Sequence, residues 1–149
     1  MTGIAIGPAA MADYDVIEAL LAQERLPLAG LKDHFDQMLV ARDGSRIAGC
    51  AALELYEGGA LLRSVAVDAE HRGTGLGSDL TRAALRLAEE HGIRAVYLLT
   101  TTAERFFPRF GFEVIDRADV PDSVMRSAEF THACPSSAIV MRKSFTSPT

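Results

Sequence analysis

The strongest constraint on this chain is the stretch Leu61–Ala88, in which a short apolar run leads through a glycine-rich loop into an amphipathic pattern. Leu61–Val67 is rich in aliphatic and β-branched residues and is closed by Asp68, which predicts a buried strand. From Leu76 onward the apolar residues recur at helical spacing, and Gly92 supplies a stop signal. The stretch therefore predicts a strand, a glycine loop and a helix in immediate succession.

This succession predicts a site for an anion. The first turn of a helix leaves N–H groups without intrahelical partners, and the helix dipole adds partial positive charge at the same end. Gly73, Gly75 and Gly77 remove side chains that would keep a phosphate away from these donors, and Arg72 adds a cation. A glycine turn that only begins a helix is the alternative. The strand before the loop and the helix after it favour a phosphate-bearing ligand.

The kind of phosphate ligand follows by elimination. A nucleotide-triphosphate loop ends in Gly-Lys-Ser/Thr, which is absent here, and a dinucleotide loop needs a third glycine where this chain has Ser78. The next strand also ends in Thr100, where a dinucleotide site has an acid for the ribose. What remains is Arg72–Gly77, which fits the pattern Arg/Gln-x-x-Gly-x-Gly/Ala. This loop resembles the pyrophosphate-binding loop of the GNAT family of acetyl-CoA-dependent N-acetyltransferases.

Composition narrows the class of protein further. A chain of 149 residues fits one domain, which we expect to cover residues 1–149. The net charge of −5 argues against a nucleic-acid partner, and the sequence has neither a membrane span nor an export leader. We therefore expect no membrane partner and a cytoplasmic location. Cys50, Cys134 and the four histidines match no metal-ligand spacing, so we expect no metal.

The remaining pattern predicts an α/β protein with a mixed, mostly antiparallel sheet. Asp43-Gly44 between apolar runs is a hairpin signal, and a strand-helix-strand unit requires a right-handed crossover with two parallel strands. We expect strands at Ile4–Ile6, Asp36–Arg42, Arg46–Tyr56, Leu61–Val67, Arg94–Thr100, Phe112–Ile115 and Ala138–Arg142, and helices from near Asp13, from Leu76 and at Ala103–Phe110. We expect the segment Asp119–Ser137 to be mostly irregular with one helical turn.

This order of elements is similar to the GNAT topology over nearly the whole chain, and the resemblance assigns residues to the cofactor. It implies two central parallel strands that splay apart, with the pantetheine arm of acetyl-CoA, the cosubstrate, lying in the gap. The pantetheine would then be held by Val65, Ala66 and Val67, and the thioester flanked by Ala103, Phe106 and Phe107. The pyrophosphate would be held by Arg72, Gly73, Thr74, Gly75, Leu76, Gly77 and Ser78.

Two narrower resemblances concern the acceptor. The runs LLRSVAV, YLLTTTAERFFPRFGF, RADVP and EFTHACPSSAIVM resemble small acetyltransferases associated with arsenic-resistance operons. The run Leu98–Thr101, followed by an aromatic-rich segment and Gly111-Phe112, resembles the acetyltransferase domain of N-acetylglutamate synthases. Both imply an amino-acid-like amine as the acceptor. The synthases have a basic residue where this chain has Cys134, and this departure argues against glutamate itself as the acceptor.

Glu54 and Arg63 are the candidates for the individual chemistry. An aliphatic amine is mostly protonated at neutral pH, so a base must remove a proton before the amine attacks the thioester. Glu54 is an acid in an otherwise apolar strand, and burial would raise its pKa; a solvated face is the alternative. Arg63 is costly to bury without an anion. It is expected to bind the acceptor's carboxylate or to pair with an acid such as Glu54.

The other candidate residues have weaker support. Many relatives have a tyrosine that protonates the departing thiolate, and Phe106-Phe107 occupies its place here, so Thr100, Thr101 or water must serve. Ser64 and Thr102 are either hydrogen-bonding neighbours or plain strand-end residues. Cys134 would contact an arsenical substrate, or it is a small apolar filler.

The predicted activity is N-acetylation of a small amino-acid-like amine, with an arsenical or another toxic analogue as one acceptor class. Two alternatives stay open: a catalytically silent CoA-binding or sensing domain, and a protein-lysine acetyltransferase. The apolar last strand also allows a homodimer.

Overall fold

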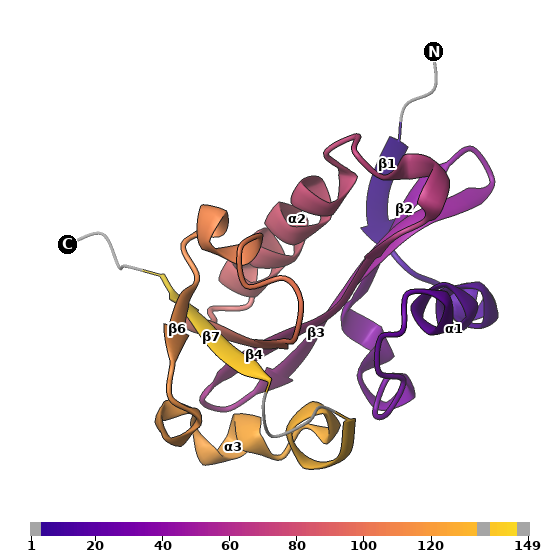
Figure 1. Ribbon diagram of the computed structural model, residues 1–149. Helices are drawn as coiled ribbons and strands as arrows, with labels where there is room; N and C mark the ends of the chain where they lie inside the picture. The colour runs from indigo at the N-terminus through magenta and orange to yellow at the C-terminus, as the bar shows by residue number, and fades with distance from the viewer. Residues whose placement is uncertain (1–3, 134–137, 146–149) are drawn as a thin grey trace.

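The computed structural model describes residues 4–133 and 138–145, which form one seven-stranded sheet between two layers of helix (Figure 1). The strand order is β1-β2-β3-β4-β5-β7-β6, and within these residues every pair is antiparallel except β4–β5. The strands are β1 Ile4–Pro8, β2 Met38–Asp43, β3 Arg46–Tyr56, β4 Gly59–Val67, β5 Ala95–Thr100, β6 Glu113–Ile115 and β7 Ile139–Ser144. The predicted fold class, a mostly antiparallel sheet with two parallel central strands, is confirmed.

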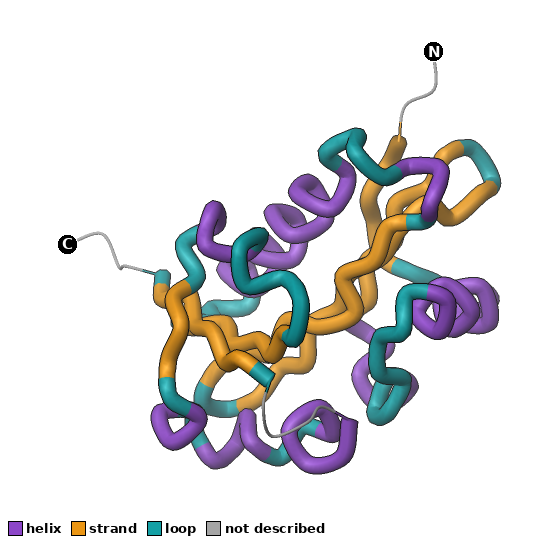
Figure 2. The backbone as a smooth tube through the Cα atoms, in the orientation of Figure 1, coloured by secondary structure: helices purple, strands orange, loops and turns teal. Residues whose placement is uncertain are grey.

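The helices divide between the two faces of the sheet (Figure 2). The α-helices are α1 Tyr14–Gln23, α2 Leu76–Glu90 and α3 Asp122–Met125. The 3-10 segments are Met11–Asp13, Lys32–Gln37, Ala69–His71, Phe107–Phe110 and Arg117–Asp119, and Glu129–Ala133 is a π-helix. One core lies under α2, and two smaller cores lie on the opposite face under α1 and α3.

Helix α2 packs as its sequence pattern predicts. Leu76, Leu80, Ala84 and Ala88 fall on one face and are buried, as expected for an amphipathic helix against a sheet. Gly92, at φ +73°, ends the helix. The Gly92 N–H donates to the Glu89 carbonyl and the Ile93 N–H donates to the Ala88 carbonyl, each at 3.0 Å, which is a Schellman motif.

The parallel pair β4–β5 is joined over a short distance. Ala60 pairs with Val96 and Leu61 with Tyr97, and the ladder ends there. Ser64, at φ +61°, then forms a bulge against β3, where the register shifts between Cys50 and Ala52. A bulge adds one residue and bends its strand. The downstream half of β4 therefore diverges from β5 and leaves backbone groups of both strands free for a ligand.

The bulge also changes which side chains of β4 face α2. Upstream of it Leu62 packs in the core under α2, and downstream Val65 and Val67 do so. Leu62 and Val65 are three positions apart, and in a continuous strand residues separated by an odd number of positions face opposite sides of the sheet. Ala66 faces the opposite core. A single inserted residue thus lets both halves of the strand bury apolar side chains.

Three expectations need correction. The predicted helix Ala103–Phe110 is only the 3-10 segment Phe107–Phe110, because Pro108 has no N–H to continue an α-helix. The segment predicted as mostly irregular with one helical turn contains that turn as α3 and also contains the π-helix, which was not predicted; residues 134–137 lie outside the described range. Strand β7 lies between β5 and β6, so the last strand is interior and does not offer an edge for pairing; the homodimer itself stays a prediction.

Candidate active site

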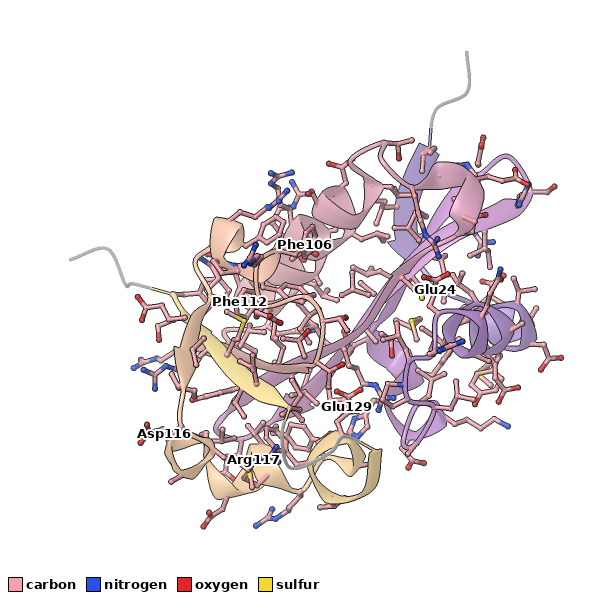
Figure 3. All side chains as sticks on the ribbon, in the orientation of Figure 1. Glu24, Phe106, Phe112, Asp116, Arg117 and Glu129 are labelled. Atoms are coloured by element: carbon pink, nitrogen blue, oxygen red, sulfur yellow. The ribbon has the colours of Figure 1, made fainter. Side chains whose placement is uncertain are left out.

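A cavity of about 450 Å³ opens where β4 and β5 diverge. One end reaches the glycine loop at Arg72 and Gly77, and the other reaches Arg63 and Glu129. Figure 3 shows that its walls come from separate parts of the chain, with Glu24 near the end of α1, Phe106 beside α2 and Glu129 after α3. The predicted or candidate site residues on the wall are Arg63, Ser64, Val65, Ala66, Val67, Arg72, Gly77, Thr100, Thr101, Thr102, Ala103, Phe106 and Phe107.

The glycine loop presents free amide groups at the start of α2. The first bond of the helix runs from the Asp79 N–H to the Gly75 carbonyl at 3.0 Å, so the N–H groups of residues 76–78 have no intrahelical acceptor. Gly73 and Gly75 have φ values of +78° and +86°, which favour glycine. Gly73, Thr74, Gly75, Leu76 and Ser78 lie beside the cavity wall, outside the set of residues that line it.

Two ion-pair groups hold this loop in place. His71 bridges two carboxylates, with Nδ1 at 2.6 Å from Asp68 Oδ1 and Nε2 at 3.0 Å from Asp43 Oδ2. Hydrogen bonding to Asp43 and then to Asp68 raises the pKa of His71. Arg72, expected to be a cation for pyrophosphate, forms an ion pair with Glu24, so a bound pyrophosphate would compete with Glu24 for it.

Arg25, which the sequence analysis missed, also lines the cavity. Helix α1 ends in a Schellman motif, with N–H groups of Arg25 and Leu26 donating to Ala22 and Leu21 at 3.1 and 2.9 Å. Arg25 therefore has the left-handed φ of +59°, at a position where glycine is preferred. An unfavourable backbone conformation at a cation on the cavity wall motivates the hypothesis that Arg25 has a role in the site.

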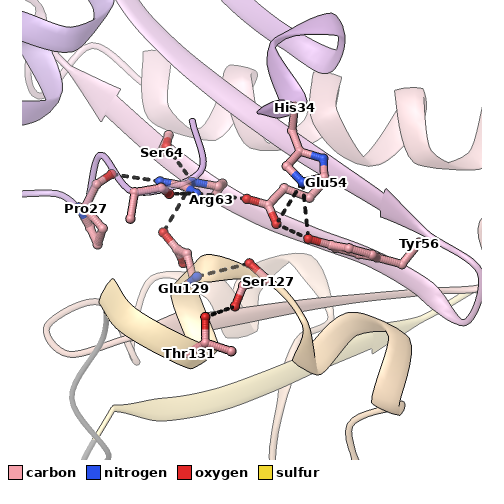
Figure 4. Close-up of polar contacts among 10 residues, drawn as sticks. Pro27, His34, Glu54, Tyr56, Arg63, Ser64, Ser127, Glu129 and Thr131 are labelled. Carbon is pink, nitrogen blue, oxygen red and sulfur yellow. Dashed lines mark hydrogen bonds and ion pairs between the residues drawn. The ribbon is translucent and has the colours of Figure 1, made fainter. Parts of the chain in front are cut away.

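Arg63 is the centre of the polar end of the cavity, with only 3% of its surface exposed (Figure 4). Its Nη1 donates to Glu54 Oε2 at 2.8 Å and to the Ala29 carbonyl at 2.6 Å, and its Nη2 donates to the Pro27 carbonyl at 2.8 Å. Its Nε donates to Ser64 Oγ at 3.1 Å and lies 3.4 Å from Glu129 Oε2. The structure therefore contains the pairing with acids that the sequence left as one of two alternatives. A contact between Arg63 and a substrate stays a prediction.

Glu54 is buried beside Arg63 and is held by neighbours. Its Oε1 accepts a hydrogen bond from the Tyr56 hydroxyl and lies 3.9 Å from His34 Nε2. Burial and the nearby Glu54 carboxylate raise the pKa of Tyr56. Glu54 is outside the set of residues lining the cavity. Its role as the base stays a prediction that the geometry does not favour.

Glu129 is the second site residue that sequence reasoning missed. It is 4% exposed, it lines the cavity, and burial raises its pKa to about 7, while Arg63 acts in the opposite direction. The run that contains it, EFTHACPSSAIVM, indicated only a family resemblance and a candidate cysteine. An acid beside a phenylalanine in that run was the available signal.

The other candidates are placed as follows. Thr100 lines the cavity, and its Oγ1 accepts a hydrogen bond from the Ala103 N–H at 2.9 Å. Phe106 packs edge-to-face on Phe107 with ring centroids 5.0 Å apart, which gives the cavity an aromatic wall.

Cys134 lies outside the described residues. Within them, no cluster of histidine, cysteine and acidic side chains is suited to a metal ion.

A second hollow, of about 510 Å³, lies between α2, Phe107–Phe110 and the end of β7. It contains none of the predicted site residues. The first cavity is therefore the candidate active site. No helix of residues 4–133 and 138–145 is long and apolar enough to cross a membrane.

A strand, glycine loop and helix beside a split parallel pair define an acyl-CoA-dependent transferase, and comparison with known proteins identifies its family. Residues 34–114, more than half of the chain, match the acetyltransferase (GNAT) domain family. The chain belongs to the GNAT acetyltransferases, which use acetyl-CoA as cosubstrate.

Three relatives illustrate the range of the family. The uncharacterized protein YwlB of Bacillus subtilis (strain 168) is 33% identical over 88% of this chain and 90% of its own length. An amino-acid acetyltransferase of Pasteurella multocida (strain Pm70) is 37% identical over 56% of this chain, which matches only 19% of that enzyme. The N-acetylglutamate synthase of Neisseria gonorrhoeae, solved with coenzyme A and N-acetyl-glutamate, superposes with a TM-score of 0.84 at 18% identity. That match covers 99% of this chain and 36% of the synthase.

Proposed function

We propose that this acetyltransferase transfers the acetyl group of acetyl-CoA to the amine of a small amino-acid-like acceptor. The observation that carries the proposal is the cavity, which joins the glycine loop to an enclosed polar end at Arg63 and Glu129. Pyrophosphate at residues 76–78 and pantetheine along Val65–Val67 would bring the thioester toward that end. An acceptor amine must then lie beside Glu129.

The charges on the wall and directly behind it support an acceptor that carries both an ammonium and an anionic group. Glu54 and Glu129 share the single cation Arg63, so this end suits a positive group. Hydrogen bonds occupy four of the five N–H groups of Arg63, which leaves it little capacity for a carboxylate. Arg25 has no ion pair within the described part of the chain, and it suits the anionic group.

Names of relatives agree with an amino-acid acceptor but leave its identity open. Glutamate is one member of this class, and an arsenical or phosphinate-like analogue, with a role in resistance, is another. A cytoplasmic location and a homodimer stay predictions from the sequence.

The test is an acceptor screen with the purified protein. Release of the CoA thiol is followed with acetyl-CoA and each of glutamate, other amino acids, their arsenical and phosphinate-like analogues, and lysine peptides; mass spectrometry identifies the product. We expect turnover with at least one amino-acid-like compound. Turnover with lysine peptides alone would favour a protein substrate. Binding of acetyl-CoA without turnover on any amine would favour a sensing domain and refute the proposal.

A further inference from the structure

We propose that Glu129 is the catalytic base that removes the proton from the acceptor's ammonium group. The inference rests on the proposed transfer to an amine, and it moves the role of base from Glu54, in the strand next to β4, to a residue at the start of the π-helix.

The position of Glu129 is fixed by the segment that precedes it. Its N–H donates to Ser127 Oγ at 3.1 Å, and the N–H groups of Phe130 and Thr131 donate to the Ser127 carbonyl at 3.0 and 3.1 Å. These bonds anchor the first turn of the π-helix, so the side chain has a defined direction. That direction takes the carboxylate toward Arg63 and the cavity (Figure 4).

The two acids beside Arg63 are bound unequally. Glu54 receives a hydrogen bond at 2.8 Å from Arg63 and another from Tyr56, so both of its oxygens are engaged. Glu129 lies 3.4 Å from the Arg63 Nε, whose hydrogen is directed to Ser64 Oγ. No hydrogen bond to the Glu129 carboxylate comes from the residues that the structure describes. Its oxygens therefore have lone pairs available to a proton donor in the cavity.

The surroundings keep Glu129 partly protonated near neutral pH. Burial raises its pKa to about 7; Arg63 from β4 lowers it and Glu54 from β3 raises it. Tyr56 from β3 and His34 from the 3-10 segment Lys32–Gln37 contact Glu54 on its far side. A base is most efficient when its pKa lies near the working pH. An acid with an ordinary pKa would be a weaker proton acceptor.

The reaction balances with this single base. The Glu129 carboxylate takes one proton from the ammonium group, and the freed lone pair forms the C–N bond with the acetyl carbonyl carbon. The C–S bond breaks, and its electron pair leaves on the CoA sulfur. A second proton of the nitrogen passes to that sulfur through water, and Glu129 releases its proton to solvent.

The experiment compares pH–rate profiles of the wild type and Glu129→Gln, with the acceptor that gives the highest kcat/KM in the screen. The wild-type kcat/KM should rise with pH through an inflection near 7. The variant should lose that inflection and at least about a hundredfold in kcat, with little change in the KM for acetyl-CoA. Glu113→Gln makes the same chemical change at an exposed site on β6 and should match the wild type.

Two measurements separate a base from a structural role. Hydroxylamine is unprotonated at neutral pH, so Glu129→Gln should acetylate it at a rate close to that of the wild type. The carboxyl carbon of Glu129, followed by NMR in the free protein, should titrate near pH 7 whatever the acceptor is. A titration below about pH 5, or a variant that keeps the wild-type profile, would overturn the inference. Wild-type inactivity toward every amine would instead refute the proposed function.

Discussion

Replacing Glu129 with glutamine should stabilise the folded protein, increasingly so as the pH rises. Burial raises the pKa of this carboxyl group from its ordinary value of 4.5 to about 7. A shift of about 2.5 units corresponds to about 3 kcal/mol. An acid with a raised pKa binds more protons in the folded state than in the unfolded state, so the stability of the wild type falls as pH rises between these two values.

The glutamine variant has no ionisable group at this position, so its stability does not fall with pH for this reason. The difference in the free energy of unfolding between variant and wild type should be close to zero at pH 4.5. It should approach about 3 kcal/mol in favour of the variant above pH 7.5. Urea titrations at intervals from pH 4.5 to 8.5 measure this difference, and Glu113→Gln is the control because its side chain is exposed.

A variant that becomes less stable than the wild type at high pH would refute this reasoning. That result would mean that ionised Glu129 stabilises the fold through Arg63 more than its burial destabilises it. The argument for an elevated proton affinity would then fail as well.

Three further predictions concern the rest of the cavity. Gly77→Val should raise the KM for acetyl-CoA about tenfold or more, a loss of ~1.4 kcal/mol in binding free energy. Gly77→Ala, whose Cβ has only ordinary contacts, is the steric control. An equal KM in both variants would show that the cofactor does not lie against Gly77. Glu24→Gln should lower the KM for acetyl-CoA by up to about fivefold at low salt by freeing Arg72, an effect of up to ~1 kcal/mol that 0.5 M salt (about a 4 Å screening length) should remove. Arg25→Gly should stabilise the fold by about 1 kcal/mol and raise the KM of the acceptor, which thermal unfolding and steady-state kinetics measure separately.

The cofactor half of the site was predictable because its signals are local. A strand, three glycines and an amphipathic helix follow one another within Leu61–Ala88, and each is encoded by residue type or by period. The hairpin at Asp43-Gly44 was predictable for the same reason, and β3 has the predicted bounds Arg46–Tyr56. The prediction of a helix at Ala103–Phe110 was wrong although a local signal against it was present, because Pro108 prevents a continuous α-helix there.

The acceptor half was less predictable because it depends on contacts between distant segments. Nothing near Arg63 in the sequence indicates that two loop carbonyls and two carboxylates surround it. Glu129 has an unusual pKa only because folding buries it, and a π-helix has no sequence signal of its own. Arg25 became notable only when its φ was known.

The ring of groups around Arg63 has a consequence for how the site is assembled. Pro27 and Ala29 come before the region that matches the family, Glu54 lies within it, and Glu129 comes after it. Contacts between such distant segments form late, because closing long loops costs entropy before any contact compensates for it. A partly folded chain in which these late contacts have not formed would have the strand, loop and helix for CoA and would lack the groups that receive the acceptor. Binding of the donor and turnover should therefore separate in partly folded chains.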